Sequence, residues 1–594
     1  MNHSDELVGK AYDAKLMKRF FSYLKPYRLY VVIIIFLIIT TTGISLLGLN
    51  LVAKALEYIT DGKLAENEKV SFLIKFTAIY FLMQALKGIL GYWQLYITNY
   101  VGQKVINDIR NQLYSHLQGL SMSFYDRNPV GRLVTRMTSD VENLAELFAS
   151  GLIAFFVDIF LMLSICVMMF ITDWRLALIS LAILPALFAV TMIFRSKARQ
   201  TYRDSRKQIA ALNSYLQENV VGMAIVQIFR REKRNYDDFE RLNHEMMVTN
   251  IKSLFYFALF FPSINLFFTI STALLIWQGA GSIMAGALTF PVFYLFWSYL
   301  QKFFQPIRDL GEKYNILQSA MASSERLFKL MDTPSDISGS AQGRIVDILR
   351  GDIKFRNVNF SYEKDNYVLK DVSFHVSPGE SVAIVGLTGS GKTTITNLLL
   401  RFYDIQEGEI LIDDIPIKDI DISSLRSKVG LILQDVHLFT GTVSENIKLG
   451  NSAITDETME SVIEYVNASE FISRLPGGFK SEVKERGATF SVGEKQLLSF
   501  ARALAIDPKL LILDEATSSI DTETEQLIQQ AMEKLIKGRT SIIIAHRLST
   551  IKKADRIIVI HKGRMVEEGT HQELLAQNGI YTKLYELQYK MQNK

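Results

Sequence analysis

The feature that most constrains this chain is a run of 25 residues without a charged side chain, Leu29–Ala53. An α-helix rises about 1.5 Å per residue, so this run is long enough to cross a hydrocarbon core of about 30 Å. The run therefore predicts a membrane-spanning helix.

Further charge-poor stretches predict five more spans. The longest, Ser253–Gln301, is too long for one span, and its glycines at 279, 281 and 286 predict a turn between two helices. The weakest lies near 78–101, because Lys87 falls inside it. The other two are Leu176–Phe194 and Ser150–Thr172, the second of which is interrupted only by Asp158. The sequence thus predicts six membrane helices.

The composition fits a chain that is part membrane and part soluble. Its 594 residues are 49% hydrophobic and 21% charged, which is too apolar for a disordered chain and too charged for a protein that lies wholly in the membrane. The net charge of +4 gives no reason to expect nucleic acid as a partner. A single cysteine, Cys166, excludes an internal disulfide framework.

The distribution of basic residues predicts the orientation of the spans. Between Arg195 and Arg234 there are ten Lys or Arg against three Asp or Glu, and Lys104–Arg136 is also basic. Because basic loops stay on the cytoplasmic side, these segments and both termini are expected in the cytoplasm, with the chain in the cell membrane.

The two basic segments, roughly 102–149 and 195–252, lack Gly/Pro clusters and are expected to be helical extensions of the spans. Lys15–Arg28 is basic and amphipathic, which predicts an interfacial helix. Four segments follow: an N-terminus with an elbow helix (1–28), a six-helix transmembrane domain (29–332), a linker rich in turn residues (333–347) and a soluble domain (348–594).

In the soluble domain, short apolar stretches alternate with helical patterns, which predicts an α/β fold with a buried parallel sheet. The expected strands are Ser381–Val385, Leu431–Leu433, Leu510–Leu513 and Ser541–Ala545.

A phosphate-binding loop follows the first of these strands. Gly386-Leu-Thr-Gly-Ser-Gly-Lys-Thr393 fits G-x-x-x-x-G-K-[ST], in which backbone N–H groups surround the phosphates of a nucleotide. Lys392 would neutralise the phosphates and Thr393 would offer its hydroxyl to Mg²⁺. The expected ATP-binding residues here are Gly386, Gly389, Ser390, Gly391, Lys392, Thr393 and Thr394.

A second part of the site is Leu510-Leu-Ile-Leu-Asp-Glu515. The apolar residues predict a buried strand that delivers Asp514 to the metal. Glu515 would lie beside the γ-phosphate and polarise the attacking water.

With these motifs, the soluble domain resembles the nucleotide-binding domain of ABC transporters, and nearly the whole chain resembles an exporter-type half-transporter. The resemblance implies a RecA-like core with antiparallel β and helical subdomains, and ATP and Mg²⁺ as cofactors. By their place in the family's motifs, Tyr362 would stack on adenine, Gln434 would ligate the metal together with Thr393 and Asp514, and His546 would contact the γ-phosphate. The segment 481–487 resembles the exporter cross-talk loop, and 518–521, with Asp521, the loop that crosses between paired domains.

The family's signature, Leu-Ser-Gly-Gly-Gln, clamps ATP bound on the opposite subunit. At its five positions this chain has Phe490, Ser491, Val492, Gly493 and Glu494. Val492 adds a β-branched side chain where a backbone should approach phosphate, and Glu494 adds a negative charge near an anion. Both changes are expected to weaken the clamp.

The chain's own ATP-holding residues are intact, whereas the clamp it donates is altered. This asymmetry predicts a heterodimer with a different half-transporter. That partner would have an intact signature and a degenerate Walker B glutamate, the position that Glu515 occupies in this chain. The pattern resembles the heterodimeric bacterial multidrug ABC exporters, with this chain as the subunit that carries the competent glutamate.

The family also places a coupling helix in each cytoplasmic segment. The first is expected near 121–131, with Phe124 and Tyr125 as apolar contacts, and the second near 219–227, around Gly222 and Met223. ATP binding would close the paired domains, and these helices would transmit the closure so that the cavity switches from inward- to outward-facing.

The expected cargo is a lipophilic, often cationic, drug or a similar amphiphile. Aromatic residues of the last two spans are candidates for the cavity wall, either there or in helix packing: Phe255, Phe257, Phe260, Phe261, Phe267, Phe268, Phe290, Phe293, Phe296 and Trp297. The polar candidates are Asp158, Asn50, Asn265 and Gln278. Asp158 is either functional or a packing partner of Lys87. A lipid flippase, a peptide exporter and an ATP-gated channel remain alternatives.

Overall fold

The computed structural model describes residues 14–60, 66–148, 153–335, 337, 343–346, 349–514, 522–545 and 548–592. The chain divides into two compact units. The membrane unit comprises Met1–Leu117 and Gly131–Thr333, and the ATPase unit comprises Gln118–Val130 and Pro334–Lys594. The ATPase unit thus includes a short piece of the N-terminal half.

Helices form the membrane unit, and most of them are long, as the uncharged runs predict. They are α1 (Ala14–Ser22), α2 (Arg28–Thr60), α3 (Glu66–Gln118), α7 (Ile153–Thr172), α8 (Trp174–Leu181), α9 (Leu184–Val221), α11 (Glu232–Met284) and α12 (Phe290–Met331).

Within the described residues, five segments are long and apolar enough to cross a membrane: Lys25–Thr60, Asn67–Gln118, Ile153–Thr172, Trp174–Phe194 and Glu232–Met284. The sixth expected span falls on α12, which is not among these five segments because Tyr, Gln and charged residues make it less apolar. It nevertheless packs at the centre of the unit. Its buried residues Phe296, Tyr299 and Phe304 share one apolar cluster with residues of α2, α7, α8, α9 and α11.

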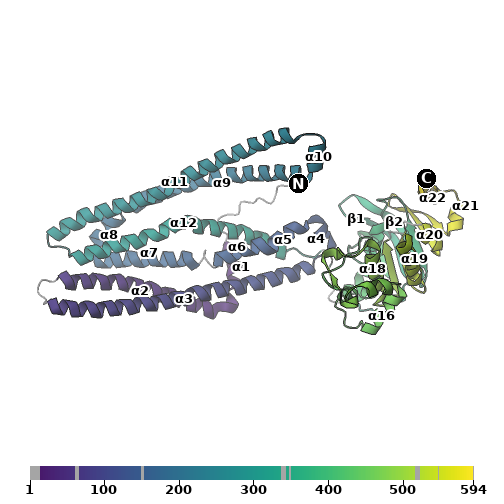
Figure 1. The fold of residues 1–594 in the computed structure, drawn as a ribbon, viewed down its shortest axis with the longest axis horizontal. Coiled ribbons are helices and arrows are strands. Elements are labelled where there is room, and N and C mark those ends of the chain that lie inside the picture. Colours follow the sequence, from purple (N-terminus) through teal and green to yellow (C-terminus); the bar gives the residue numbers. More distant parts are fainter. Residues whose placement is uncertain are drawn as a thin grey trace. The chain divides into compact units, whose positions relative to one another are not determined.

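The predicted extensions of the spans are continuous helix in part, over 102–118 in α3, 195–221 in α9 and 232–252 in α11. α3 and α11 each have 53 residues, about 80 Å at 1.5 Å per residue, which is far more than a bilayer requires. Figure 1 shows α9 and α11 side by side, joined at one end by the short helix α10 (Met223–Ile228).

Short helices replace the long ones between residues 122 and 146. They are α4 (Met122–Arg127), α5 (Val130–Thr135), a π-helical turn (Arg136–Asp140) and α6 (Val141–Glu146). Asp140 lies in the π turn and is buried. Its carboxylate accepts hydrogen bonds from Ser323 Oγ, at 2.9 Å, and from Arg326 Nε, at 3.0 Å, so it fastens this segment to α12.

The ATPase unit is built on the predicted parallel sheet. Its strand order is β12-β11-β3-β10-β9-β6, in which only β12 runs antiparallel to its neighbour. The bounds are β3 (Ser381–Val385), β6 (Val429–Ile432), β9 (Leu510–Asp514), β10 (Thr540–Ile544), β11 (Arg556–His561) and β12 (Arg564–Gly569). β3, β9 and β10 are buried at every position, which explains their uninterrupted apolar sequences. The four strands expected from the sequence are therefore confirmed to within two residues.

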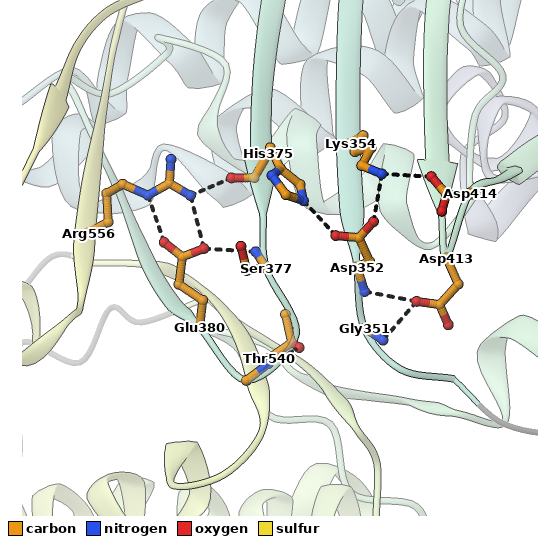
Figure 2. Close-up of polar contacts among 11 residues, drawn as sticks. Gly351, Asp352, Lys354, His375, Ser377, Glu380, Asp413, Asp414, Thr540 and Arg556 are labelled. Carbon is orange, nitrogen blue, oxygen red and sulfur yellow. Dashed lines mark hydrogen bonds and ion pairs between the residues drawn. The ribbon is translucent and has the colours of Figure 1, made fainter.

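A second, antiparallel sheet has the order β2-β1-β4-β5, with β1 (Ile353–Ser361), β2 (Tyr367–Val376), β4 (Glu407–Ile412) and β5 (Ile415–Pro416). Polar contacts join the start of β1 to the turn between β4 and β5 (Figure 2). Asp413 accepts bonds from the backbone N–H groups of Gly351 and Asp352, and Lys354 pairs with Asp352 and Asp414. Arg556, on β11, pairs with Glu380 beside β3.

Helices complete the ATPase unit. They are α13 (Lys392–Leu399), α14 (Ile422–Arg426), α15 (Val443–Lys448), α16 (Asp456–Tyr465), α17 (Ser469–Arg474), α18 (Val492–Leu504), α19 (Thr522–Ile536), α20 (Leu548–Lys553), α21 (His571–Ala576) and α22 (Ile580–Gln592). A two-stranded pair, β7 (Gly441–Thr442) and β8 (Glu482–Val483), joins α15 to the segment expected to be the cross-talk loop.

Candidate nucleotide site and its surroundings

The predicted phosphate loop runs from the end of β3 into α13. Gly389 and Gly391 adopt left-handed backbone angles, with φ of 80° and 106°. A Cβ on Gly391 would also lie 2.7 Å from a methyl group of Leu369. Glycine is therefore required at Gly391 by both conformation and space.

Lys392 and Ser390 direct polar groups into this loop. Lys392 is buried, and its Nζ donates to the carbonyl oxygens of Gly386 and Leu387, at 2.8 and 3.0 Å. Burial lowers the pKa of Lys392, an effect that the charge of Asp514 opposes. Within the described part of the chain, the buried Ser390 Oγ has no hydrogen-bond partner. An ammonium group and an unused hydroxyl at a glycine loop suit a nucleotide phosphate.

The carboxyl edge of the parallel sheet brings the other predicted groups together. Thr393 Oγ1 lies 3.5 Å from Asp514 Oδ2, and Asp514 itself is buried at the end of β9. Gln434 follows the neighbouring strand β6 by two residues and is exposed. Hydroxyl, carboxylate and amide oxygens are ligands that Mg²⁺ accepts, so these residues fit the predicted metal role.

Tyr362 lies just beyond β1, with its ring half-buried. The ring packs edge to face against Phe360 and Tyr403, with centroid distances of 4.9 and 5.0 Å. Its hydroxyl donates to Thr394 Oγ1 at 3.2 Å, which fixes the ring beside the start of α13. The adenine-stacking role of Tyr362 stays a prediction.

Tyr403 is a residue that sequence reasoning missed. Its ring contacts Tyr362, and its hydroxyl donates to the carboxylate of Asp126 on α4, the helix expected to be the first coupling helix. Burial and the hydrogen bond with Asp126 both raise the pKa of Tyr403, so the hydroxyl keeps its proton at neutral pH. Tyr403 follows α13 in the aromatic, charged segment Arg401–Asp404, which was the available signal.

Polar bonds from two helices brace the loop after Gln434. Asn446, on α15, exchanges two hydrogen bonds with the backbone of Phe439, and Arg502, on α18, donates to the carbonyl of His437. These bonds link the predicted glutamine loop to the signature helix.

The altered signature begins α18. Ser491 is the N-cap: its Oγ accepts a bond from the N–H of Glu494 at 3.2 Å, and the Glu494 carboxylate accepts one from the N–H of Ser491 at 2.7 Å. The pair forms a capping box. Val492 projects outward with 55% of its surface exposed, while Phe490 and Gly493 are buried.

Three predicted residues, Glu515, Asp521 and His546, lie outside the described residues.

Phe124 and Tyr125 lie on α4, and Gly222 caps the start of α10, which contains Met223. Short helices therefore occupy both places where coupling helices are expected.

The membrane candidates are not brought together by any contact in the described residues. Asn50 donates to Tyr299 Oη at 3.1 Å, whereas Asn265 and Gln278 are exposed. Asp158 forms an ion pair with Lys313 on α12, so the alternative that it pairs with Lys87 is wrong. Phe260 and Phe296 are buried in the apolar cluster and contribute to helix packing.

Comparisons with known proteins agree with this architecture. Residues 31–307 match the model of the ABC transporter transmembrane region, and residues 369–518 match that of the ABC transporter. The chain is 40% identical over 590 residues to the uncharacterized ABC transporter ATP-binding protein YknV of Bacillus subtilis, covering 99% of this chain and 96% of that protein. It is 37% identical over 576 residues to a putative multidrug export ATP-binding/permease protein of Staphylococcus aureus, covering 96% and 100%.

Among solved structures, a bacterial Atm1-family ABC exporter with ATP bound has a TM-score of 0.79 and 27% identity, covering 94% of this chain and 98% of that one. The fold predicted from the sequence, a helical membrane domain followed by an α/β nucleotide-binding domain, is thereby confirmed. The chain belongs to the ABC transporter family, as an exporter-type half-transporter of the membrane whose ATPase is coupled to transport.

Proposed function

We propose that this chain is one subunit of a heterodimeric exporter that uses ATP to move lipophilic drugs or similar amphiphiles out across the cell membrane. Both termini and the ATPase unit lie in the cytoplasm. The resemblance to a putative multidrug export protein supports the substrate class. The arrangement of the signature supports the heterodimer.

The observation that carries the proposal is the capping box at Ser491 and Glu494. Ser491 Oγ is already bonded to the N–H of Glu494, and a carboxylate lies at the N-terminus of α18, where the family binds the γ-phosphate of the opposite subunit. The exposed Val492 lies at the first position of the helix. A clamp with this geometry disfavours a second anion and hinders the approach of backbone to phosphate.

The chain's own half of the site is suited to hydrolysis. Lys392 and the loop amides hold the phosphates, and Thr393, Asp514 and Gln434 hold Mg²⁺. Glu515 polarises the attacking water while His546 contacts the γ-phosphate. Mg²⁺ supplies charge neutralisation of the phosphates when bound. The partner completes this site with its intact signature.

The lone chain provides the test. In proteoliposomes, the purified full-length chain should bind ATP but hydrolyse it slowly, because both sites of a homodimer would carry the altered signature. Reconstitution with a half-transporter that has an intact signature should restore turnover, and Glu515→Gln in this chain should abolish it while ATP binding persists. Rapid hydrolysis by the lone chain would exclude the heterodimer.

A further inference from the structure

A pocket of about 750 Å³ lies at one end of the membrane unit, where α2 ends and both α3 and α12 begin. Two side chains of opposite charge and four aromatic rings contribute to its wall: Lys54, Glu57 and Tyr58 of α2, Phe72 and Phe76 of α3, and Phe290 of α12. None of these residues belongs to the nucleotide site or to the expected coupling helices. The pocket is therefore a separate feature of the membrane unit.

The position of Lys54 places the pocket at a membrane surface. Lys54 directly follows the uncharged run Leu29–Ala53, whose 25 residues extend about 37 Å at 1.5 Å per residue. This length exceeds a hydrocarbon core of about 30 Å, so the end of the run reaches the level of the lipid headgroups. Helix α2 continues beyond it to Thr60. The pocket thus lies in the layer that contains the headgroup charges.

The two charges of the pocket have a defined order along α2. Glu57 is three residues closer to the end of the helix than Lys54, which corresponds to about 4.5 Å along the axis. Side chains at this spacing are neighbours, yet within the described residues neither one forms an ion pair. The nearby Lys69 differs, because its Nζ donates to the carbonyl oxygen of Ile59 at 3.0 Å. The pocket therefore offers a cation on its membrane side and an anion toward the helix end.

Aromatic rings form the wall beside these charges. Tyr58 stacks on Phe72, with ring centroids 3.9 Å apart and an interplanar angle of 24°, and Phe76 follows Phe72 at 6.3 Å. Phe290, the first residue of α12, is 52% exposed. Aromatic faces attract ammonium groups, and clusters of rings are a common way to bind alkylated ones. The rings and the carboxylate of Glu57 thus favour the same positively charged ligand group.

One face of α2 continues from the pocket into the membrane. Residues spaced by four, three and four positions form a single stripe on a helix, and here they are Leu47, Leu51, Lys54 and Tyr58. Leu47 is exposed, and Leu51 lines the pocket. From the membrane interior outward, the stripe therefore presents apolar side chains, then a cation, and then an aromatic ring beside the anion of Glu57.

We propose that this pocket binds the zwitterionic headgroup of an amphiphile, with its phosphate at Lys54 and its ammonium at Glu57 beside the aromatic rings. Such a headgroup has the same order of groups: an apolar tail, a phosphate, a short link and then the ammonium. Because the tail lies toward the hydrocarbon, each ligand charge meets the opposite charge of the pocket. A ligand with only a cation would be repelled by Lys54, and one with only an anion would be repelled by Glu57.

Equilibrium binding of three probes with the same tail tests this site. The full-length chain is purified in micelles of the uncharged detergent dodecyl maltoside. Radiolabelled dodecylphosphocholine, dodecyltrimethylammonium and dodecyl phosphate are then added separately, with protein-free micelles as background. We expect the zwitterion to bind most tightly. Lys54→Gln and Glu57→Gln should each weaken its binding about tenfold, the effect expected when one contact to a charged group is lost.

The probes with a single charge separate the two residues. Glu57→Gln should bind dodecyl phosphate at least as tightly as the unaltered chain does, and Lys54→Gln should do so for dodecyltrimethylammonium, because each variant removes a like charge. Phe72→Leu should weaken the binding of both probes that carry an ammonium and leave dodecyl phosphate unaffected. The exposed Lys75 of α3 provides the matched control, since Lys75→Gln should change the binding of none of the three.

Gln variants that bind dodecylphosphocholine as tightly as the unaltered chain, or that lose all three probes equally, would overturn the proposal. Added phosphatidylcholine identifies the source of the ligand: displacement of the probe supports a membrane lipid, and its absence supports a free amphiphile. The measurement uses neither ATP nor a partner subunit, so its outcome is independent of the heterodimer test.

Discussion

The hydroxyl of Tyr403 donates a hydrogen bond to the carboxylate of Asp126, while the ring of Tyr403 meets that of Tyr362 edge to face, with centroids 5.0 Å apart. Asp126 lies 277 residues away in the sequence, on α4, which clusters with the ATPase unit. Tyr403 thus connects Tyr362, which is expected to stack on adenine, with α4, which is expected to be a coupling helix. We therefore predict that Tyr403 transmits nucleotide occupancy to α4.

Tyr403→Phe tests this link, because it keeps the ring contact with Tyr362 and removes only the bond to Asp126. We expect unchanged ATP affinity and a loss of substrate-stimulated ATPase of about fivefold, equivalent to one hydrogen bond of about 1 kcal/mol. Asp126→Asn should have a smaller effect, since an amide oxygen still accepts the bond. ATP binding that weakens in parallel with turnover would place Tyr403 in the nucleotide site alone.

Much of the fold could be predicted from the sequence because its signals are local. A span appears as an uncharged run such as Leu29–Ala53, and a phosphate loop appears as consecutive glycines around Lys392. The four predicted strands are fully or largely buried, and their unbroken apolar sequences identify them.

Contacts between distant segments could not be predicted in this way. The pairing of Tyr403 with Asp126 depends on tertiary packing, and so does the choice of Lys313 over Lys87 as the partner of Asp158. The π turn that ends at Asp140 has no sequence signature, because it arises from the packing of that segment against α12.

The signature segment provides a gain-of-function prediction. Glu494→Gln keeps the S-x-x-E/Q capping box and removes the charge, and Val492→Gly removes the branched side chain from the helix start. Together they should raise the ATPase rate of the lone chain, which we expect to be slow, roughly tenfold or more, because a preorganised donor that contacts a reacting phosphate contributes that much. The rate is measured by phosphate release in proteoliposomes.

Glu494→Ala is the matched control for that experiment. It removes the charge and the capping box together, so it should destabilise α18 by about 1 kcal/mol without a comparable gain in rate. An equal gain from the Ala variant would show that the charge alone limits the clamp, and no gain from the double variant would exclude the signature as the cause of slow turnover.

The buried Asp140 predicts a stability effect in the membrane unit. Asp140 accepts hydrogen bonds from Ser323 and Arg326. Because the Arg326 side chain is 39% exposed, solvent partly screens its ion pair with Asp140. Asp140→Asn should lower the free energy of unfolding by about 1–3 kcal/mol, seen as a lower Tm in detergent. The neighbouring Glu142 is exposed, and Glu142→Gln should leave the Tm unchanged; equal shifts would mean that the bonds to α12 contribute nothing.

Asp352 predicts a dependence of stability on pH. Burial raises the pKa of Asp352, but the hydrogen bonds from His375 and Lys354 outweigh burial and hold that pKa below its usual value. A carboxylate with a lowered pKa stabilises the folded state above its unfolded pKa of about 4, and this contribution is lost as the pH falls through the folded value. The Tm of the full chain should therefore decline on acidification.

Asp352→Asn isolates this contribution from that of the other carboxylates. The variant should have a lower Tm than the unaltered chain at neutral pH, and the difference between the two should shrink as the pH falls below about 4, since the protonated carboxyl group has also lost its ion pairs. Scanning fluorimetry of both proteins across this range measures the difference directly. A difference that stays constant would mean that Asp352 acts through backbone geometry at the start of β1, where its N–H donates to Asp413, and that its charge has no part in stability.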